Sequence, residues 1–252
     1  MQGVGQFYDS FAEAYHLIFE DWDRAIVRQA RIVDGLIKSR LRRPCQIVHD
    51  CACGVGTQAI GLAGLGYTVS GSDLSQNAIR RAIREAEKRE LIIEFRVSDM
   101  TNLVEYPSDH FDVLGAFDNA LPHLSIDQLT AAATSFHRVL RSDGLFAASI
   151  RDYDSLIESR PEFQGPSFFN SAGPRRIIHQ VWEWTAPDMY DVHQYITLKQ
   201  HDGWESLHFA SQYRCLLRAE LTQVLLAAGF ADVEWLMPST TGYYQPIVIG
   251  RA

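Results

Sequence analysis

The sequence predicts an α/β fold built on a doubly wound, mainly parallel sheet. Between residues 47 and 150, short apolar segments with the character of strands alternate with segments of helical periodicity. This alternation is typical of parallel strands joined by helices that cover both faces of a sheet. A glycine turn over 51–57 directly follows the first strand and precedes a helix. Such a turn is typical of the edge at which these sheets bind their ligands.

The individual elements follow from the spacing of apolar residues. Residues 7–43 carry apolar side chains at three- and four-residue steps, interrupted by the acidic and aromatic stretch 19–23, so we expect two helices that end before Pro44. The stretch 141–144 has the composition of a turn. Strands are expected over 47–50, 67–72, 92–97, 111–117 and 145–150, and helices over 57–65, 75–90 and 126–140.

The pattern changes near residue 170. Segments 176–184, 190–198 and 205–213 are three consecutive candidate strands joined by polar turns, which predicts an antiparallel meander. A helix over 218–228, ended by Gly229, and strands over 233–237 and 247–249 complete the chain. We therefore expect a single domain over 1–252. Within it, residues 1–43 form a helical lid, and residues 160–214 form an antiparallel insertion that covers the active site.

Composition narrows the classes of function. The 252 residues carry a formal net charge of −8, which argues against a nucleic-acid or anionic-membrane partner, because both require a basic surface. The four cysteines, Cys45, Cys51, Cys53 and Cys215, lack the paired spacing of a zinc site, so we expect no metal. Unpaired cysteines in a core segment, together with the lack of a leader-like or membrane-spanning apolar run, indicate a soluble cytoplasmic protein.

Polar residues mark the end of each predicted parallel strand. Ligands of open α/β sheets bind beyond the carboxyl ends of the strands, so these residues are the first candidates for a site. Any one of them alone is typical of a solvated loop or a helix cap, whereas five in succession are harder to explain in that way. They are Asp50, Asp73, Asp99-Met100, Asp118-Asn119 and Arg151-Asp152.

The glycine turn and Asp73 together indicate a nucleoside-containing cofactor. Asp73 lies nineteen residues after Gly54, at the end of the next strand, where a carboxylate accepts hydrogen bonds from ribose hydroxyls. The sequence Gly54-x-Gly56-x-x-Ala59 also fits the NAD pattern, although a single match is weak. Asp50 would repel a pyrophosphate, and the series of acids suits a cationic cofactor without phosphate, such as S-adenosylmethionine.

At this point the residues resemble a known family. The stretch Val48–Thr57 resembles motif I of class I S-adenosylmethionine-dependent methyltransferases, with Ala52 in place of the usual first glycine. The likeness covers about residues 8–150 and implies the Rossmann-like methyltransferase fold. A closer likeness is to glycine N-methyltransferase and related small-molecule N-methyltransferases. It rests on Asn119-Ala-Leu-Pro-His123, Arg151-Asp-Tyr-Asp154 and the tyrosine-rich stretch 242–246.

The resemblance implies a role for each candidate residue. Asn119 and Arg151 would contact the acceptor, with Tyr15 and His123 as weaker candidates for assisting an amine. Arg24 would meet the methionine carboxylate of the cofactor, with Arg28 as the alternative. The implied cofactor-binding residues are Trp22, Arg24, Asp50, Ala52, Gly54, Gly56, Asp73, Leu74, Asp99, Met100 and Phe117.

The resulting hypothesis is S-adenosylmethionine-dependent methylation of a small molecule, most simply at an amine or amino-acid nitrogen, by a monomer or homodimer. O- or C-methylation of a small metabolite is the alternative within the same class. An NAD-dependent oxidoreductase and a cofactor-binding regulatory protein without catalysis are the alternatives outside it.

Overall fold

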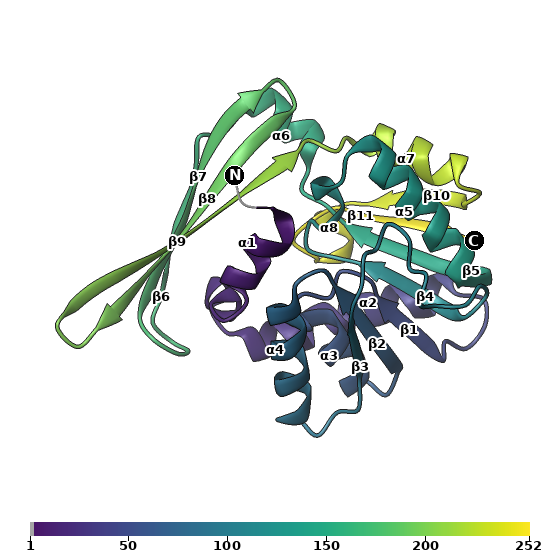
Figure 1. Cartoon of the computed structure of the whole chain (residues 1–252), viewed down its shortest axis with the longest axis horizontal. Helices are drawn as coiled ribbons and strands as arrows, with labels where there is room; N and C mark the ends of the chain where they lie inside the picture. The colour runs from purple at the N-terminus through teal and green to yellow at the C-terminus, as the bar shows by residue number, and fades with distance from the viewer. Residues whose placement is uncertain (1–2) are drawn as a thin grey trace.

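The structure is a computed structural model in which residues 3–252 are described. Two sheets dominate it: a seven-stranded sheet with helices on both faces and a separate four-stranded antiparallel sheet that extends away from it (Figure 1). The first helix of the chain, α1 (Val4–Phe11), lies between the two sheets (Figure 1). This arrangement confirms the predicted doubly wound α/β fold.

The seven-stranded sheet has the order β10-β11-β5-β4-β1-β2-β3. Strands β1 to β5 are parallel, and β11 runs antiparallel to both of its neighbours. The chain passes outward from β1 to β3 and then returns to β4, so the carboxyl ends of β1 and β4 border the point where the strand order reverses. The strands are β1 (Ile47–Asp50), β2 (Thr68–Asp73), β3 (Glu94–Val97), β4 (Phe111–Ala116), β5 (Leu140–Ser149), β10 (Ala231–Leu236) and β11 (Ile247–Arg251).

Helices cover the two faces of this sheet through alternate residues of the same strands. In β4, Val113 packs with residues of α2 and α3 on one face, and Leu114 packs with residues of α5 and α7 on the other. Every residue of β4 is buried, which accounts for its largely apolar sequence. The exception, Asp112, forms ion pairs with Arg43 and Arg141. The helices are α2 (Trp22–Arg40), α3 (Thr57–Gly64), α4 (Gln76–Glu87), α5 (Ile126–Val139), α6 (Tyr153–Ser159), α7 (Arg218–Ala227) and α8 (Pro238–Thr241).

The four-stranded sheet is an insertion between β5 and α7. Its strands pair in sequence order, and all four lie within the expected range 160–214. Three of them correspond to the predicted meander, whereas β6 was not predicted. The strands are β6 (Phe163–Phe169), β7 (Arg176–Ala186), β8 (Met189–Gln200) and β9 (Gly203–Arg214).

The N-terminal segment, defined here as residues 3–21, connects the insertion to the seven-stranded sheet. After α1 it forms a short 3₁₀ helix, η1 (Tyr15–Ile18), and it then leads into α2. Arg176 of β7 donates hydrogen bonds to the carbonyl oxygens of Leu17 and Glu20, and Arg81 of α4 donates to that of Ala12. The expected break near residues 19–23 therefore separates η1 from α2.

One predicted turn is part of a strand. Residues 141–144 belong to β5, which begins at Leu140, and the register with β4 shifts between Phe111 and Val113. Asp143 takes a positive φ of 61° within this irregular stretch. Leu140 and Leu145 pair with Phe111 and Val113 of β4, so residues 141–144 form a wide irregularity in the strand. Within it, Asp143 and Gly144 form hydrogen bonds with Ala252 instead.

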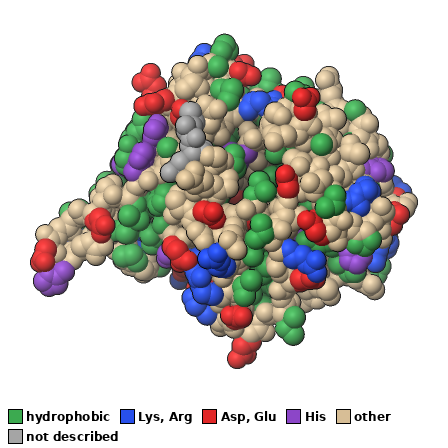
Figure 2. All heavy atoms as spheres, viewed as in Figure 1, with side chains coloured by type: hydrophobic (Ala, Val, Ile, Leu, Met, Phe, Trp, Pro, Cys, Tyr) green, Lys and Arg blue, Asp and Glu red, His purple; other side chains and the backbone are tan. Residues whose placement is uncertain are grey.

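The surface shows no concentration of one charge on the face drawn in Figure 2, where Lys and Arg side chains are interspersed with Asp and Glu. Over residues 3–252, none of the helices has both the length and the apolarity needed to cross a membrane. Within the same residues, no group of three or more His, Cys, Asp or Glu side chains is arranged to hold a metal ion.

Candidate active site

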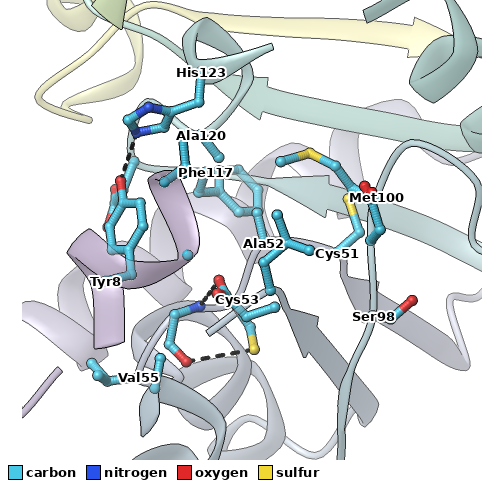
Figure 3. Close-up of a pocket in the computed structure, with 18 of the residues that line it drawn as sticks. Tyr8, Cys51, Ala52, Cys53, Val55, Ser98, Met100, Phe117, Ala120 and His123 are labelled. Carbon is cyan, nitrogen blue, oxygen red and sulfur yellow. Dashed lines mark hydrogen bonds between the residues drawn. The ribbon is translucent and has the colours of Figure 1, made fainter. Parts of the chain in front are cut away.

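A first cavity of about 250 Å³ lies at the carboxyl ends of β1 to β4 (Figure 3). The strand ends form its floor, and the N-terminal segment closes it from above. Its walls comprise Val4, Gly5, Tyr8, Ala12, Tyr15, Cys51–Val55, Thr57, Gln58, Asp73, Leu74, Ala78, Ser98–Thr101, Phe117, Asp118, Ala120, His123, Leu124 and Gln128.

The glycine turn exposes backbone to this cavity. Gly54 has a φ of +52°, a conformation that favours glycine, and a Cβ added there would meet no atom within 4 Å. The backbone amide of Gly54 donates to Oδ2 of Asp73 at 2.9 Å, and that of Ser75 donates to Oδ1 at 2.8 Å. Each carboxylate oxygen has further lone pairs for a ligand. The carboxylate is thus fixed beside the turn before any ligand binds.

The charges of the first cavity suit a cation. Asp73, Asp99 and Asp118 line it, and none of its lining residues, all from the described part of the chain, is a lysine or arginine. Leu74 and Met100 add apolar surface suitable for a flat ring. A pyrophosphate would meet three carboxylates without a compensating cation, whereas a sulfonium and an ammonium group would be attracted. The cavity therefore fits S-adenosylmethionine better than NAD.

Asp50 is not one of the carboxylates that would repel a pyrophosphate, although the sequence suggested that it is. It is 1% exposed, lies behind the cavity wall, and burial raises its pKa to about 8. The protonated form predominates near pH 7, so repulsion of a pyrophosphate by Asp50 is not supported. One oxygen accepts a long hydrogen bond of 3.4 Å from the amide of Ala52, and within residues 3–252 the other has no partner.

A second cavity of about 810 Å³ adjoins the first. It is bounded by the N-terminal segment, the ends of β4 and β5, the insertion and the stretch before β11. Its lining includes many aromatic side chains, among them Phe7, Phe11, Phe19, Phe163, Trp182, Tyr213 and Tyr244. Tyr8, Tyr15 and Asp118 line both cavities, so the two spaces meet at these residues.

Arg151 presents a positive charge to the second cavity. Its guanidinium lies 4.7 Å from the ring centre of Trp182 and 5.1 Å from that of Tyr213, and it donates a hydrogen bond of 2.7 Å to Tyr190. The neighbouring aspartates, Asp152 and Asp154, pair with Arg218 instead. Within residues 3–252 no carboxylate forms an ion pair with Arg151, so its charge remains available to an anion.

Asn119 helps to position Arg151. Its Oδ1 accepts a hydrogen bond of 3.0 Å from the backbone amide of Arg151, and its Nδ2 donates to the hydroxyl of Tyr153 at 2.9 Å. Both Asp118 and Asn119 have positive φ angles, 56° and 69°. These two residues turn the chain sharply where β4 ends and direct their side chains to the cavities.

His123 is already engaged. Its Nδ1 lies 3.2 Å from the carbonyl oxygen of Gln212, which can only accept, so Nδ1 carries the proton. Nε2 then accepts from the hydroxyl of Tyr8 at 3.0 Å, and the two side chains point toward one another (Figure 3). Burial lowers the pKa of His123 to about 4, so the ring is neutral near pH 7. It joins α1 to the sheet edge rather than presenting a free nitrogen.

The cavities bring together most, but not all, of the predicted site residues. Ala52, Gly54, Asp73, Leu74, Asp99, Met100 and Phe117 line the first cavity, together with Tyr15 and His123; Asn119 and Arg151 line the second, again with Tyr15. The lining residues, all from within 3–252, do not include Trp22, Arg24, Asp50 or Gly56. Gly56 instead directly precedes α3 behind the turn.

The expected roles of Arg24 and Trp22 need correction. Arg24 lies on the outer face of α2, where its side chain is 89% exposed and contacts Asp21. Trp22 is buried, and its indole N–H donates to Thr57 at 3.0 Å, so it supports the cavity wall from behind. The alternative, Arg28, lines the second cavity rather than the first. The orientation of α2 decides these positions, and periodicity alone does not reveal it.

Several contributors were missed from the sequence. The sequence pattern places Tyr8 on a helix face and Gln58 at a helix start without a role in a site, yet both line the first cavity. Asp118 was noted at a strand end without a role. Tyr244 belongs to the tyrosine-rich stretch that carried part of the resemblance, and this stretch was the available signal for it.

The fold and the first cavity thus define a protein that binds a cationic nucleoside. Comparison with known proteins makes this specific. The family model described as "Methyltransferase domain" matches residues 48–144. A putative methyltransferase of Geobacillus sp. (strain WCH70) is 25% identical, and the alignment covers 90% of each chain.

Two further relatives are informative. A glycine/sarcosine N-methyltransferase of Parasynechococcus marenigrum (strain WH8102) is 29% identical over 60% of this chain and 55% of that protein, so this match spans about half the length of the relative. The solved structure of a sugar N-methyltransferase from Streptoalloteichus sp. superimposes with a TM-score of 0.75 at 15% identity, covering 100% of this chain and 94% of that one. This second likeness concerns the fold.

The family model and the relatives support the predicted likeness to class I S-adenosylmethionine-dependent methyltransferases, an enzyme class whose cofactor is S-adenosylmethionine. The predicted family, enzyme class and cofactor are confirmed, and the NAD-dependent alternative is set aside.

Proposed function

We propose that the enzyme methylates a nitrogen atom of a small molecule that binds in the second cavity. The observation that carries this proposal is the junction of the two cavities at Tyr8, Tyr15 and Asp118. A cofactor in the first cavity and an acceptor in the second would meet there. The names of two relatives, a glycine/sarcosine N-methyltransferase and a sugar N-methyltransferase, support nitrogen as the acceptor atom.

The residues of the first cavity fit the parts of the cofactor. Asp73 would accept from the ribose hydroxyls, and Asp99 and Met100 would contact the adenine by hydrogen bond and by packing. The backbone around Ala52 and Gly54 would hold the methionine moiety. Bound there, S-adenosylmethionine supplies an electrophilic methyl group on a sulfonium centre.

The chain itself must align the acceptor and exclude water, because alignment supplies much of the rate enhancement in a reaction of two bound molecules. Arg151 would hold an anionic group of the acceptor, and Asn119 would keep Arg151 in place. Tyr8 and Tyr15 carry the aromatic surface of the N-terminal segment over the junction. Because Nε2 of His123 is bonded to Tyr8, this contact supports a positioning role for His123 rather than a role as a base.

Product analysis tests the proposal. The purified protein is incubated with S-adenosylmethionine and, separately, with glycine, sarcosine, ethanolamine or D-glucosamine, and with their hydroxyl counterparts glycolate, ethylene glycol and D-glucose. We expect formation of S-adenosylhomocysteine together with an N-methylated product from at least one amine. Methylation of a hydroxyl compound alone would overturn the assignment to nitrogen. Cofactor binding without turnover of any compound would instead favour a non-catalytic role.

A further inference from the structure

The carboxylate of Asp118 is held at the junction of the two cavities by an unusual set of partners. Oδ1 accepts from the hydroxyls of Tyr243 and Tyr244, each at 2.6 Å. Oδ2 accepts from the amide of Gln58 at 2.9 Å and from the hydroxyl of Tyr15 at 3.4 Å. These donors come from α3, from the N-terminal segment and from the stretch before β11, so three distant parts of the chain fix one carboxylate.

All four partners are neutral. Within residues 3–252, no arginine, lysine or histidine forms an ion pair with Asp118. Neutral donors stabilise a carboxylate by hydrogen bonding without cancelling its charge. The field of Asp118 therefore extends into both cavities, and in that partly enclosed space it is screened less than at an open surface.

Among the described residues that line the second cavity, Asp118 and Arg151 are two charges of opposite sign without an ion-pair partner; the exposed Arg28 also lines it without one. Asp118 lies where it meets the first cavity, whereas Arg151 lines the second cavity only. A ligand that bridges them would place a cationic group beside the cofactor and an anionic or strongly polar group farther away. Binding two charges of opposite sign at fixed positions orients a small molecule as well as attracting it.

We propose that Asp118 binds the acceptor as its protonated amine, directs that nitrogen toward the first cavity and accepts the proton that the nitrogen must lose before its lone pair can take the methyl group. This inference rests on the proposed function and narrows the acceptor to small amines that are cationic at neutral pH. The N-methylated product is again a basic amine, so the same carboxylate also suits the product. A neutral hydroxyl acceptor would leave the charge of Asp118 unpaired in the closed cavity, which disfavours it.

A competing role for Asp118 is to bind the amino group of the cofactor, since the residue lines both cavities. The two roles differ in which ligand is weakened when the charge is removed. Asp118→Asn keeps the size of the side chain, and the three tyrosine hydroxyls can accept as well as donate, so their contacts can persist. Asp127→Asn is the matched control, because it removes the same charge from an exposed site outside both cavities.

Calorimetry provides the test. Wild type and both variants are titrated with S-adenosylhomocysteine, and the saturated proteins are then titrated with glycine, ethanolamine and D-glucosamine and with glycolate, ethylene glycol and D-glucose. We expect at least one amine to bind wild type more tightly than its hydroxyl counterpart. Asp118→Asn should raise the dissociation constant of that amine by about tenfold or more, which is the usual scale for losing a hydrogen bond to a charged group. Asp127→Asn should not.

Three outcomes would overturn the inference. The hydroxyl compounds could bind as tightly as the amines, or no amine could bind at all. Alternatively, Asp118→Asn could lose affinity for S-adenosylhomocysteine only. These results are separable from failure of the proposed function. If wild type and Asp118→Asn methylate an amine with the same KM, nitrogen methylation stands and only the role of Asp118 fails. If methyl transfer occurs only to a hydroxyl compound, the proposed function fails as well.

Discussion

The backbone amide of Gly54 donates a hydrogen bond of 2.9 Å to the carboxylate of Asp73. This contact joins the turn after β1 to the end of β2, two adjacent strands of the sheet. It explains why a glycine and an acid nineteen residues apart act as one unit. The turn cannot move away from the carboxylate without leaving a backbone N–H unpaired, so both are positioned before the cofactor arrives.

Gly54→Ala should reduce cofactor affinity much more than it reduces stability. The added methyl group would meet no protein atom within 4 Å, so it would occupy space in the first cavity. The positive φ costs on the order of 1 kcal/mol of folding free energy. Gly66→Ala is the matched control, since Gly66 also has a positive φ and open space but lies outside both cavities. Calorimetry with S-adenosylhomocysteine should show a loss for Gly54→Ala only; equal affinities in both variants would contradict the placement of the cofactor.

Asp73→Ala should weaken cofactor binding by about 1–3 kcal/mol, the usual range when a polar group loses its partner. Part of this loss would come from the turn, because the amides of Gly54 and Ser75 would lose their acceptor. Titration with S-adenosylmethionine and with 2′-deoxyadenosine separates the two contributions. If the carboxylate contacts the ribose, the variant should lose less affinity for the deoxynucleoside than for the cofactor. Unchanged affinity for S-adenosylmethionine would remove the ribose role.

Arg151→Lys should lower kcat/KM for the acceptor while leaving cofactor affinity intact. A lysine keeps the charge but loses the planar group that lies against Trp182 and Tyr213. A reduction of about tenfold or more is expected from the loss of a charged hydrogen bond. Arg160→Lys is the control, because Arg160 lies 4.7 Å from the ring centre of Trp184 and does not line either cavity. Steady-state kinetics with an amine found in the product analysis would show equal effects in both variants if Arg151 has no role with the acceptor.

The parallel sheet was predictable because strand-like segments alternate with helical ones along the chain, and because its central strands β4 and β5 are mostly buried and apolar. Strand β6 was not, since Gly165-Pro166 interrupts it and most of its residues are exposed. The strand-end acids were also predictable, because parallel topology brings the ends of successive strands to one edge. That rule needs only the order of strands and helices, which local sequence patterns supply.

The remainder of the site depends on contacts that local patterns do not encode. Tyr8 and Tyr244 approach the same junction from opposite ends of the chain. The outward direction of Arg24 follows from how α2 packs on α3, a tertiary feature. The candidate residues that lie on strand ends line the first cavity more often than the candidates on helices that pack over the sheet.

Replacing Arg176 should loosen the N-terminal segment without unfolding the domain. This buried arginine of β7 donates to backbone carbonyl oxygens of the segment and of the loop before β7, and these acceptors belong to Leu17, Phe19, Glu20, Ala172 and Pro174. Arg176→Met removes the donors while retaining an apolar stem. Limited proteolysis should then cleave within residues 12–21 sooner than in wild type. Arg175→Met, at an exposed neighbouring position, should cleave like wild type; identical cleavage of the two variants would show that Arg176 does not secure the segment.

The buried ring of His49 should make stability depend on pH. Its two nitrogens lie 2.8 Å and 3.0 Å from the hydroxyls of Ser70 and Ser72, and burial lowers its pKa from 6.5 to about 3. Between these values the unfolded chain binds a proton that the folded chain does not, so the free energy of unfolding falls as the pH falls. For this group alone the decrease between pH 7 and pH 5 is about 2 kcal/mol. Urea unfolding of wild type and His49→Gln should show that the variant loses less stability over this interval, although it is less stable at pH 7. His201→Gln is the control, because His201 is exposed, and its free energy of unfolding should depend on pH as that of wild type does. If the free energies of unfolding of wild type and His49→Gln depend on pH in the same way, His49 is not held neutral by the fold.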